Sequence, residues 1–156
     1  MEQRYDYSVS VEWTGNNGHG TTGYADYERN HAISSPGKPD ILASSDTPFR
    51  GDASRHNPET LLLSSLSTCH MLWYLHLCAD AGIIVTKYTD TAPCTMTILA
   101  AGNGHFKDVT LHTIVTITDK SRIEEANALH EQANKKCFIA NSVKFTVHHK
   151  PTCLAE

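Results

Sequence analysis

Closely spaced metal or redox ligand pairs are missing from this 156-residue chain. Its five cysteines form no CxxC pair, and the ten histidines complete no zinc pattern, although His70 and His76 follow Cys69 closely. Structural zinc sites use close ligand pairs from two segments, so we predict neither a metal nor a cofactor. An odd number of widely spaced cysteines also excludes a disulfide scaffold and predicts free thiols in a reducing compartment.

Clustered positive charge is absent as well. The net charge is −4 and the basic residues are scattered, which excludes the basic patch that a nucleic-acid partner requires. The N-terminal segment lacks the apolar core of a signal peptide. The long apolar stretch 57–82 holds too many serine, threonine and histidine residues for a membrane span. We therefore predict a cytoplasmic protein of one domain, residues 1–156, with 40% hydrophobic residues to form its core.

The stretch from Asn57 to Gly82 predicts one long helix. Asn57 is a favourable N-cap, Pro58 suits the first helical position, and Gly82 suits the left-handed conformation that ends a helix. Glu59 in the first turn complements the helix dipole. Apolar side chains occupy every side, so we expect a helix buried all round. One apolar stripe comprises Leu62, Leu66, Cys69, Trp73 and Leu77.

Extended segments are predicted before and after this helix. Alternating side chains predict a strand over 5–13, and residues 21–33 predict one or two more. Residues 34–56 are rich in Pro, Gly, Ser and Asp and predict a long irregular crossing segment. Later strands are expected at 83–85, at 94–99, at 106–118 with an irregularity near Thr113, and at 144–149.

A second helix is predicted after residue 120. Ser121 is expected to cap it, and Glu124 three residues later completes a capping box. Strands, helix, strands, helix and a final strand predict an α+β fold. The long helix has more apolar surface than one small sheet buries. We therefore expect a homodimer in which two such helices pack together, wrapped by strands of both chains.

Three segments resemble a known family: NPETLLLSSLSTCHMLWYLHLCADAGIIVTKYTD, a following GxGHF strand, and LHEQANKKCFIANSVKFTV. Together they resemble the OsmC/Ohr family (osmotically inducible protein C and organic hydroperoxide resistance protein), most closely its OsmC-like branch. The resemblance implies an intertwined homodimer with antiparallel strands around the long helix. It also implies a thiol-dependent peroxidase in which Cys69 attacks an organic hydroperoxide, Cys137 resolves the product, and a small dithiol such as dihydrolipoamide is the reductant. Glu59 matches the glutamate of the family site.

Peroxide attack requires a thiolate, and a thiol among leucines in mid-helix needs nearby positive charge to form one. An arginine would favour the thiolate of Cys69 and polarise the peroxide, and a carboxylate would hold that arginine in place. Arg50 and Arg55 directly precede the helix and are the local candidates, with Arg29 a more distant one. The hydroperoxide reductases carry their arginine in the loop after the first strand, where this chain has TGNNGHG.

Glu59 and Cys69 are expected to belong to different sites within one chain. On one straight helix they would lie about 15 Å apart along the axis and about 80° apart around it. Antiparallel packing of two such helices would bring Glu59 of one chain toward Cys69 of the other. The sequence thus predicts a site built at the dimer interface.

Two other functions are compatible with these residues. A non-catalytic binding module would hold a small apolar or thiol-reactive molecule in the interface pocket, and the missing loop arginine favours it. A cysteine-nucleophile hydrolase would need a carbonyl substrate and a base near Cys69, such as His70 or His76. His70 points about 100° away from Cys69 around the helix, which favours a packed histidine. Sulfenic acid formation at Cys69 distinguishes the peroxidase from both alternatives.

Overall fold

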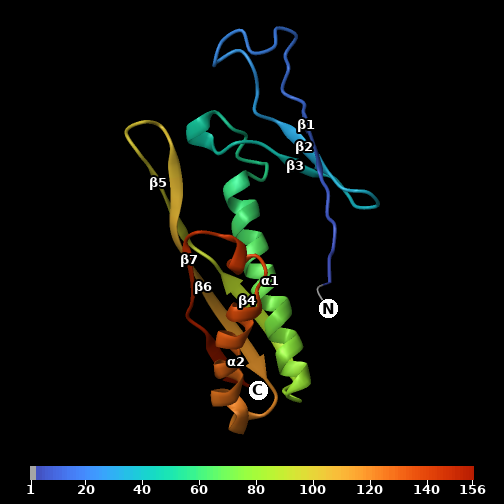
Figure 1. Cartoon of the computed structure of the whole chain (residues 1–156), viewed down its shortest axis with the longest axis vertical. Coiled ribbons are helices and arrows are strands. Elements are labelled where there is room, and N and C mark those ends of the chain that lie inside the picture. Colours follow the sequence, from blue (N-terminus) through green and yellow to red (C-terminus); the bar gives the residue numbers. More distant parts are fainter. Residues whose placement is uncertain (1–2) are drawn as a thin grey trace. The chain divides into compact units, whose positions relative to one another are not determined.

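The computed structural model describes residues 3–156, and its contacts separate an N-terminal unit, up to Leu61, from a C-terminal unit that begins at Leu62. Helix α1 (Pro58–Asp80) begins in the first unit and ends in the second (Figure 1). The two helices and the mixed sheet of the chain confirm the predicted α+β fold. That the chain forms one domain stays a prediction.

The N-terminal unit contains a three-stranded antiparallel sheet. Its strands are β1 (Ser10–Trp13), β2 (His31–Ser34) and β3 (Ile41–Ala43), in the order β1-β2-β3. The short 3-10 helix η1 (Thr47–Phe49) follows them. The central strand β2 thus pairs on both sides, which fixes its register.

Three strand predictions in this unit are wrong in extent. The strand expected over 5–13 is reduced to its last four residues, and residues 21–30 form turns and bends with no strand. The segment 34–56, predicted as irregular, contains β3 and η1. Strands of three or four residues carry too little alternation to be seen in a sequence, because their pairing rather than their pattern defines them.

Both ends of α1 follow from local sequence, as predicted. The Thr60 N–H donates to the side-chain oxygen of Asn57 at 2.8 Å, which caps the first turn. Gly82 has a φ of 68°, its N–H donates to the Ala79 carbonyl at 3.0 Å, and the Ile83 N–H reaches back to the Cys78 carbonyl at 2.8 Å. These two bonds form a Schellman motif, which terminates the helix.

The fully buried face of α1 shares only Leu66 with the apolar stripe named from the sequence. Leu66, His70, Tyr74 and Cys78, four residues apart, are buried, whereas Leu72 is 63% exposed. The expectation of a helix buried all round is wrong within a single chain, because a helix that is apolar on every side gives no signal of which side meets the sheet. By length and composition alone, α1 is long and apolar enough to cross a membrane. Its buried face, however, packs against the sheet and the second helix like that of a core helix.

The C-terminal unit is organised around one strand of 14 residues, β6 (Gly104–Ile117), which pairs with each of the other strands of its sheet. Its antiparallel neighbours are β4 (Val85–Thr91) and β5 (Cys94–Ile98). Its parallel neighbours are β7 (Thr146–His149) and β8 (Thr152–Ala155). The sheet is therefore mixed rather than wholly antiparallel. Strand β8 was not predicted, because Pro151 interrupts the pattern before it.

Strand β6 is regular where an irregularity was expected. Thr113 pairs with Asp90 in continuous register, and its side chain is buried. The register shifts lie elsewhere: one extra residue lies in β4 between Val85 and Lys87, and one lies in β6 between Phe106 and Val109, opposite Cys94 and Met96 of β5. A buried threonine in an otherwise apolar series was thus mistaken for a bulge.

The second helix, α2 (Ile123–Lys136), is preceded by the short 3-10 helix η2 (Lys120–Arg122). The predicted capping box is wrong. The side chain of Asp119 accepts the Ser121 N–H at 2.9 Å and the Ser121 hydroxyl at 2.7 Å, so Asp119 caps the η2 turn that leads into α2. Arg122, which directly precedes α2, makes no side-chain cap bond. A further 3-10 turn, η3 (Ala140–Ser142), follows α2.

The core between the sheet and the helices consists of two apolar clusters separated by polar side chains. One cluster joins Tyr74 and Cys78 of α1 to Val115 and Ile117 of β6 and to the buried face of α2. The second joins Leu66 of α1 to Val109 and Leu111 of β6. The positions between them are polar and fully buried on β6, at Thr113, and on α1, at His70. His130 of α2 is fully buried too, between Leu129 and Ala133 of the first cluster.

Candidate active site

Cys69 opens onto an apolar hollow of about 270 Å³ in the C-terminal unit. Residues 69, 72, 73 and 76 follow one another at helical spacing, so one face of α1 forms a wall of this hollow. Phe138, from the segment after α2, supplies the other side. The lining residues are Cys69, Leu72, Trp73, His76 and Phe138. A half-buried thiol therefore faces a space bounded mainly by apolar and aromatic surface.

Cys137 lies beside Cys69 at the C-terminal end of α2. Its N–H donates to the Asn134 carbonyl at 3.3 Å, and its sulfur accepts the Ala140 N–H at 3.4 Å, so the backbone fixes the buried thiol. Burial and, to a smaller extent, the neighbouring Cys69 thiol raise the pKa of Cys137 to about 11, and backbone N–H groups oppose the shift. The fold thus brings together the two cysteines, 68 residues apart, that the family resemblance selected.

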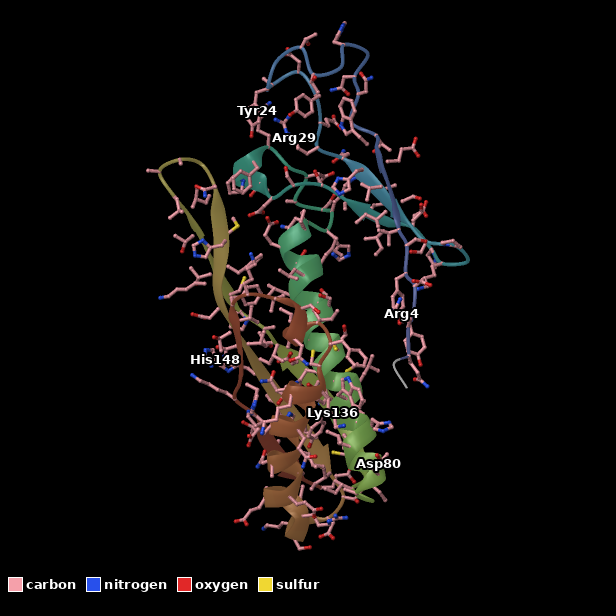
Figure 2. The ribbon with its side chains drawn as sticks, in the orientation of Figure 1. Arg4, Tyr24, Arg29, Asp80, Lys136 and His148 are labelled. Carbon is pink, nitrogen blue, oxygen red and sulfur yellow. The ribbon has the colours of Figure 1, made fainter. Side chains whose placement is uncertain are left out.

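Aromatic and charged side chains surround the hollow. The Trp73 ring meets the Phe138 ring edge to face, with centroids 5.6 Å apart, and the Lys136 ammonium lies 5.1 Å from the Trp73 centroid. His76 is paired with Asp80 at 3.2 Å. Figure 2 labels Lys136 at the end of α2 and Asp80 at the end of α1. The hollow is therefore apolar within and charged at its rim.

His70, next to Cys69 in sequence, belongs to the buried face of α1 and not to the hollow. Its Nε2 atom lies 2.9 Å from Nδ1 of His130, and the His149 ring stacks on both imidazoles, at centroid distances of 5.8 and 6.4 Å. Burial, with a smaller effect of the His149 imidazole, lowers the pKa of His70 to about 4. Burial, with smaller effects of His70 and His149, lowers the pKa of His130 to about 3. In the described chain no group of three or more ligating side chains is arranged to hold a metal ion.

The candidate arginines belong to the N-terminal unit. Arg29 is held between the Tyr24 and Tyr27 rings, at 4.3 and 4.0 Å from their centroids, and donates to both backbone carbonyls (Figure 2). Arg55 pairs with Asp52 at 3.4 Å. The guanidinium of Arg50 donates to no other group within residues 3–156, and its backbone has a φ of 64°, which a non-glycine residue rarely adopts.

Glu59 lies in the first turn of α1, as expected for a residue that complements the helix dipole. Its Oε2 atom is shielded from solvent and accepts no hydrogen bond in the part of the chain that the structure describes. A shielded carboxylate oxygen needs a donor, and an arginine is the side chain best suited to provide one. The roles of Glu59, Arg50 and Arg55 in a site stay predictions.

A comparison with family models gives one match, to the OsmC-like proteins, over residues 51–151. These residues make up well over half of the chain and include α1, the whole sheet before β8, and α2. The chain belongs to the OsmC-like family. The resemblance found in the sequence is thereby confirmed.

Solved structures extend this OsmC-like match to the full chain. An OsmC-like protein of unknown function from Vibrio cholerae is 28% identical, with a TM-score of 0.85 over 96% of this chain and 100% of that one. Two organic hydroperoxide resistance proteins share the fold: that of Elizabethkingia anophelis is 22% identical (TM-score 0.68, 99% and 100% covered), and that of Legionella pneumophila is 18% identical (TM-score 0.67, 97% and 99% covered). No curated protein sequence matches the chain.

One expectation about the OsmC-like site needs correction. The loop after the first strand was expected to contain only TGNNGHG and hence no arginine. Because residues 21–30 form no strand, this loop runs from Thr14 to Asn30 and contains Arg29. The loop after the first strand therefore does contain an arginine.

Sequence reasoning missed part of the site. Phe138, which lines the hollow, lies far from Cys69 in sequence, and no local pattern connects the two. The available signal for the hollow was the helical spacing of Cys69, Trp73 and His76, which places all three on one face of α1.

Proposed function

We propose that this protein reduces organic hydroperoxides, with Cys69 as the attacking thiol and Cys137 as the resolving one. The observation that carries the proposal is the placement of the two thiols side by side at the edge of an apolar hollow. Membership of the OsmC-like family, whose fold is shared by hydroperoxide resistance proteins, supports it.

The proposed cycle has three steps: oxidation of Cys69, formation of the disulfide and its reduction. The Cys69 thiolate attacks one peroxide oxygen, the O–O bond breaks, and the alcohol leaves after taking a proton, so that the sulfur becomes a sulfenic acid. The Cys137 sulfur then attacks Cys69; an S–S bond forms, the S–O bond breaks, and the hydroxyl leaves as water with the Cys137 proton. An external dithiol such as dihydrolipoamide reduces the disulfide. The raised pKa of Cys137 suits this order, since Cys137 keeps its proton until Cys69 is oxidised.

The lining of the hollow supports an organic substrate over hydrogen peroxide. Leu72, Trp73 and Phe138 offer apolar surface next to Cys69, and an alkyl or aryl group gains free energy by covering it. Hydrogen peroxide has no such group. We therefore expect the catalytic efficiency to favour cumene hydroperoxide.

We propose that an arginine activates Cys69 by favouring its thiolate. Arg50 is the first candidate, because its guanidinium has no partner within residues 3–156. Arg55 and Arg29 are further candidates, although each already binds groups of its own unit. We propose that Glu59, with its shielded and unpaired carboxylate oxygen, orients the activating arginine.

We propose that the working form is a cytoplasmic homodimer. The ten-residue separation of Glu59 and Cys69 on one helix requires a second chain to complete a site that uses both. Exposed apolar side chains support such a partner surface: Tyr7, Val9, Val11, Leu72 and Phe138. Sedimentation at micromolar concentration tests this, since a mass of 17.2 kDa, that of one chain, contradicts it.

The decisive experiment measures consumption of cumene hydroperoxide and of hydrogen peroxide by the reduced protein, with dihydrolipoamide or dithiothreitol. Turnover should be lost in Cys69→Ser and strongly reduced in Cys137→Ser, and wild type should yield a Cys69–Cys137 disulfide. Cys94→Ser, a half-buried thiol outside the hollow, is the matched control and should keep its turnover. No turnover and no oxidation of Cys69 would refute the peroxidase and leave a binding protein.

A cysteine hydrolase is the second candidate, because His76 lines the same hollow as Cys69 and pairs with Asp80. A Cys–His–Asp set is the arrangement that activates a thiol for attack on a carbonyl. His76→Ala distinguishes the two reactions. Ester hydrolysis would vanish in this variant, whereas peroxide reduction, which needs no base at that position, would persist.

A further inference from the structure

The side chain of His130, on α2, contacts two residues on consecutive turns of α1. His130 lies 2.9 Å from His70, nitrogen to nitrogen, and its ring stacks on Tyr74 with centroids 3.8 Å apart. His70 and Tyr74 are four residues apart and both are fully buried. The planes of the two imidazoles differ by only 8°, so the hydrogen bond lies close to the plane of both rings. The contact joins α1 and α2 in a directional way that apolar packing does not.

This contact has a fixed relation to the two thiols. His70 directly follows Cys69 on α1. His130 precedes Cys137 by seven residues, two helical turns, so both face the same side of α2, with the fully buried Ala133 between them. The register of α1 against α2 therefore decides whether the sulfurs of Cys69 and Cys137 meet.

We propose that the hydrogen-bonded His70–His130 pair sets this register and that both histidines are positioning residues for formation of the Cys69–Cys137 disulfide. The inference deepens the proposed function and rests on it for its biological meaning. In the step concerned, the Cys137 sulfur displaces hydroxyl from the Cys69 sulfenic acid. The S–S bond forms, the S–O bond breaks, and the Cys137 proton leaves with the hydroxyl as water.

The hydrogen bond specifies one arrangement because the alternatives leave buried nitrogens unpaired. His70 Nδ1 and His130 Nε2 already lack partners in the described chain, so losing the bond between the other two nitrogens would leave both imidazoles wholly unsatisfied. A disulfide tolerates Cα separations of only about 4.4 to 6.8 Å, and a slide of the helices by about 1 Å is enough to impair such a reaction. The buried bond joins His70, one residue from Cys69, to His130, seven residues from Cys137. It is therefore placed to prevent that slide.

The test measures the equilibrium between the Cys69–Cys137 dithiol and disulfide in buffers of reduced and oxidised dithiothreitol, with the bond quantified by peptide mass spectrometry. His130→Phe keeps a ring on Tyr74 but removes the nitrogens, and it should disfavour the disulfide about tenfold or more. His130→Asn places an amide near the position of Nδ1 and should remain within about threefold of wild type. His149→Phe is the matched control, since it changes a stacked ring without touching the bond, and it should leave the equilibrium unchanged.

A folded His130→Phe protein with the wild-type equilibrium overturns the inference, and so does an equal loss in His149→Phe. If His130→Phe fails to fold, by circular dichroism and thermal melting, the same comparison is made between His70→Leu, which lacks the bond, and His70→Gln, which replaces Nε2 by an amide. Equal equilibria in that pair overturn the inference too. These measurements use no peroxide. A protein that turns over no hydroperoxide would refute the proposed function, but the comparison of dithiol–disulfide equilibria would still test the role of the two histidines.

Discussion

Among single residues, Cys137 is the clearest case of a group controlled by its surroundings. Burial is the main cause of its pKa of about 11, and the Cys69 thiol beside it adds to the shift. Only the thiolate is alkylated, so the reaction of Cys137 with iodoacetamide should be slow at pH 8 and rise with pH toward an inflection near 11. Peptide mass spectrometry of timed samples follows each cysteine separately.

The Cys69→Ala variant separates the two causes. It removes the neighbouring thiol and leaves the burial of Cys137, so the inflection should move to lower pH without reaching the ordinary value. Cys153, whose pKa is raised by burial alone, is an internal reference that this substitution should not affect. An inflection of Cys137 at the ordinary cysteine pKa in wild type would show that the thiol is not held in its protonated form.

The residues of the candidate site were predictable to the extent that a motif or a helical spacing carries them. Cys69 and Cys137 came from the family resemblance, and the fold places them together. His130 was not among the predicted site residues, and its partner His70 lies 60 residues away. Contacts of that separation depend on how elements pack, so the available hint was the four-residue spacing of His70, Tyr74 and Cys78 on one face of α1.

At the scale of elements, the end of α1 depends on a single glycine. Gly82 has a φ of 68°, and a Cβ added there would meet only the Arg122 guanidinium at 3.9 Å, so there is space for a side chain. The cost of Gly82→Ala is therefore conformational, and urea unfolding should show a loss of about 1 kcal/mol. Gly82→Asn is the control, because asparagine tolerates the left-handed region better, and it should recover part of the loss. An alanine variant as stable as wild type would mean that the Schellman motif does not hold the helix end.

The ends of α1, which depend on capping residues nearby in the sequence, were predicted correctly. Short strands that exist only through pairing with another strand were not. The ends of α1 were correct because Asn57 and Gly82 act within a few residues of themselves. Strands β3 and β8 were missed because three or four residues become a strand only beside β2 or β6. The cap before the second helix was placed at Ser121 rather than Asp119, since two capping residues in close succession give the same signal and only the geometry separates them.

For the molecule as a whole, the buried imidazoles predict a specific dependence of stability on pH. The pKa of His70 is lowered to about 4 and that of His130 to about 3, chiefly by burial, whereas in an unfolded chain both would be near 6.5. Between these values the unfolded chain binds more protons than the folded one. The free energy of unfolding is therefore at its maximum above about pH 6.5 and falls as the pH drops toward 4, by about 3 kcal/mol for each of the two imidazoles.

Urea unfolding between pH 7 and pH 5 measures this dependence before the carboxylates contribute. The groups that face the cluster act in opposite directions on the third imidazole: Glu131 raises the pKa of His149 and His148 lowers it, while burial lowers it most. Because His130→Asn removes one buried imidazole, its unfolding free energy should change less over this range than that of wild type. A wild-type free energy that stays constant from pH 7 to pH 5 would mean that the imidazoles are protonated equally in the folded and unfolded chains. His70 and His130 would then be solvated in the folded protein, and their hydrogen bond could not fix the register of α1 and α2.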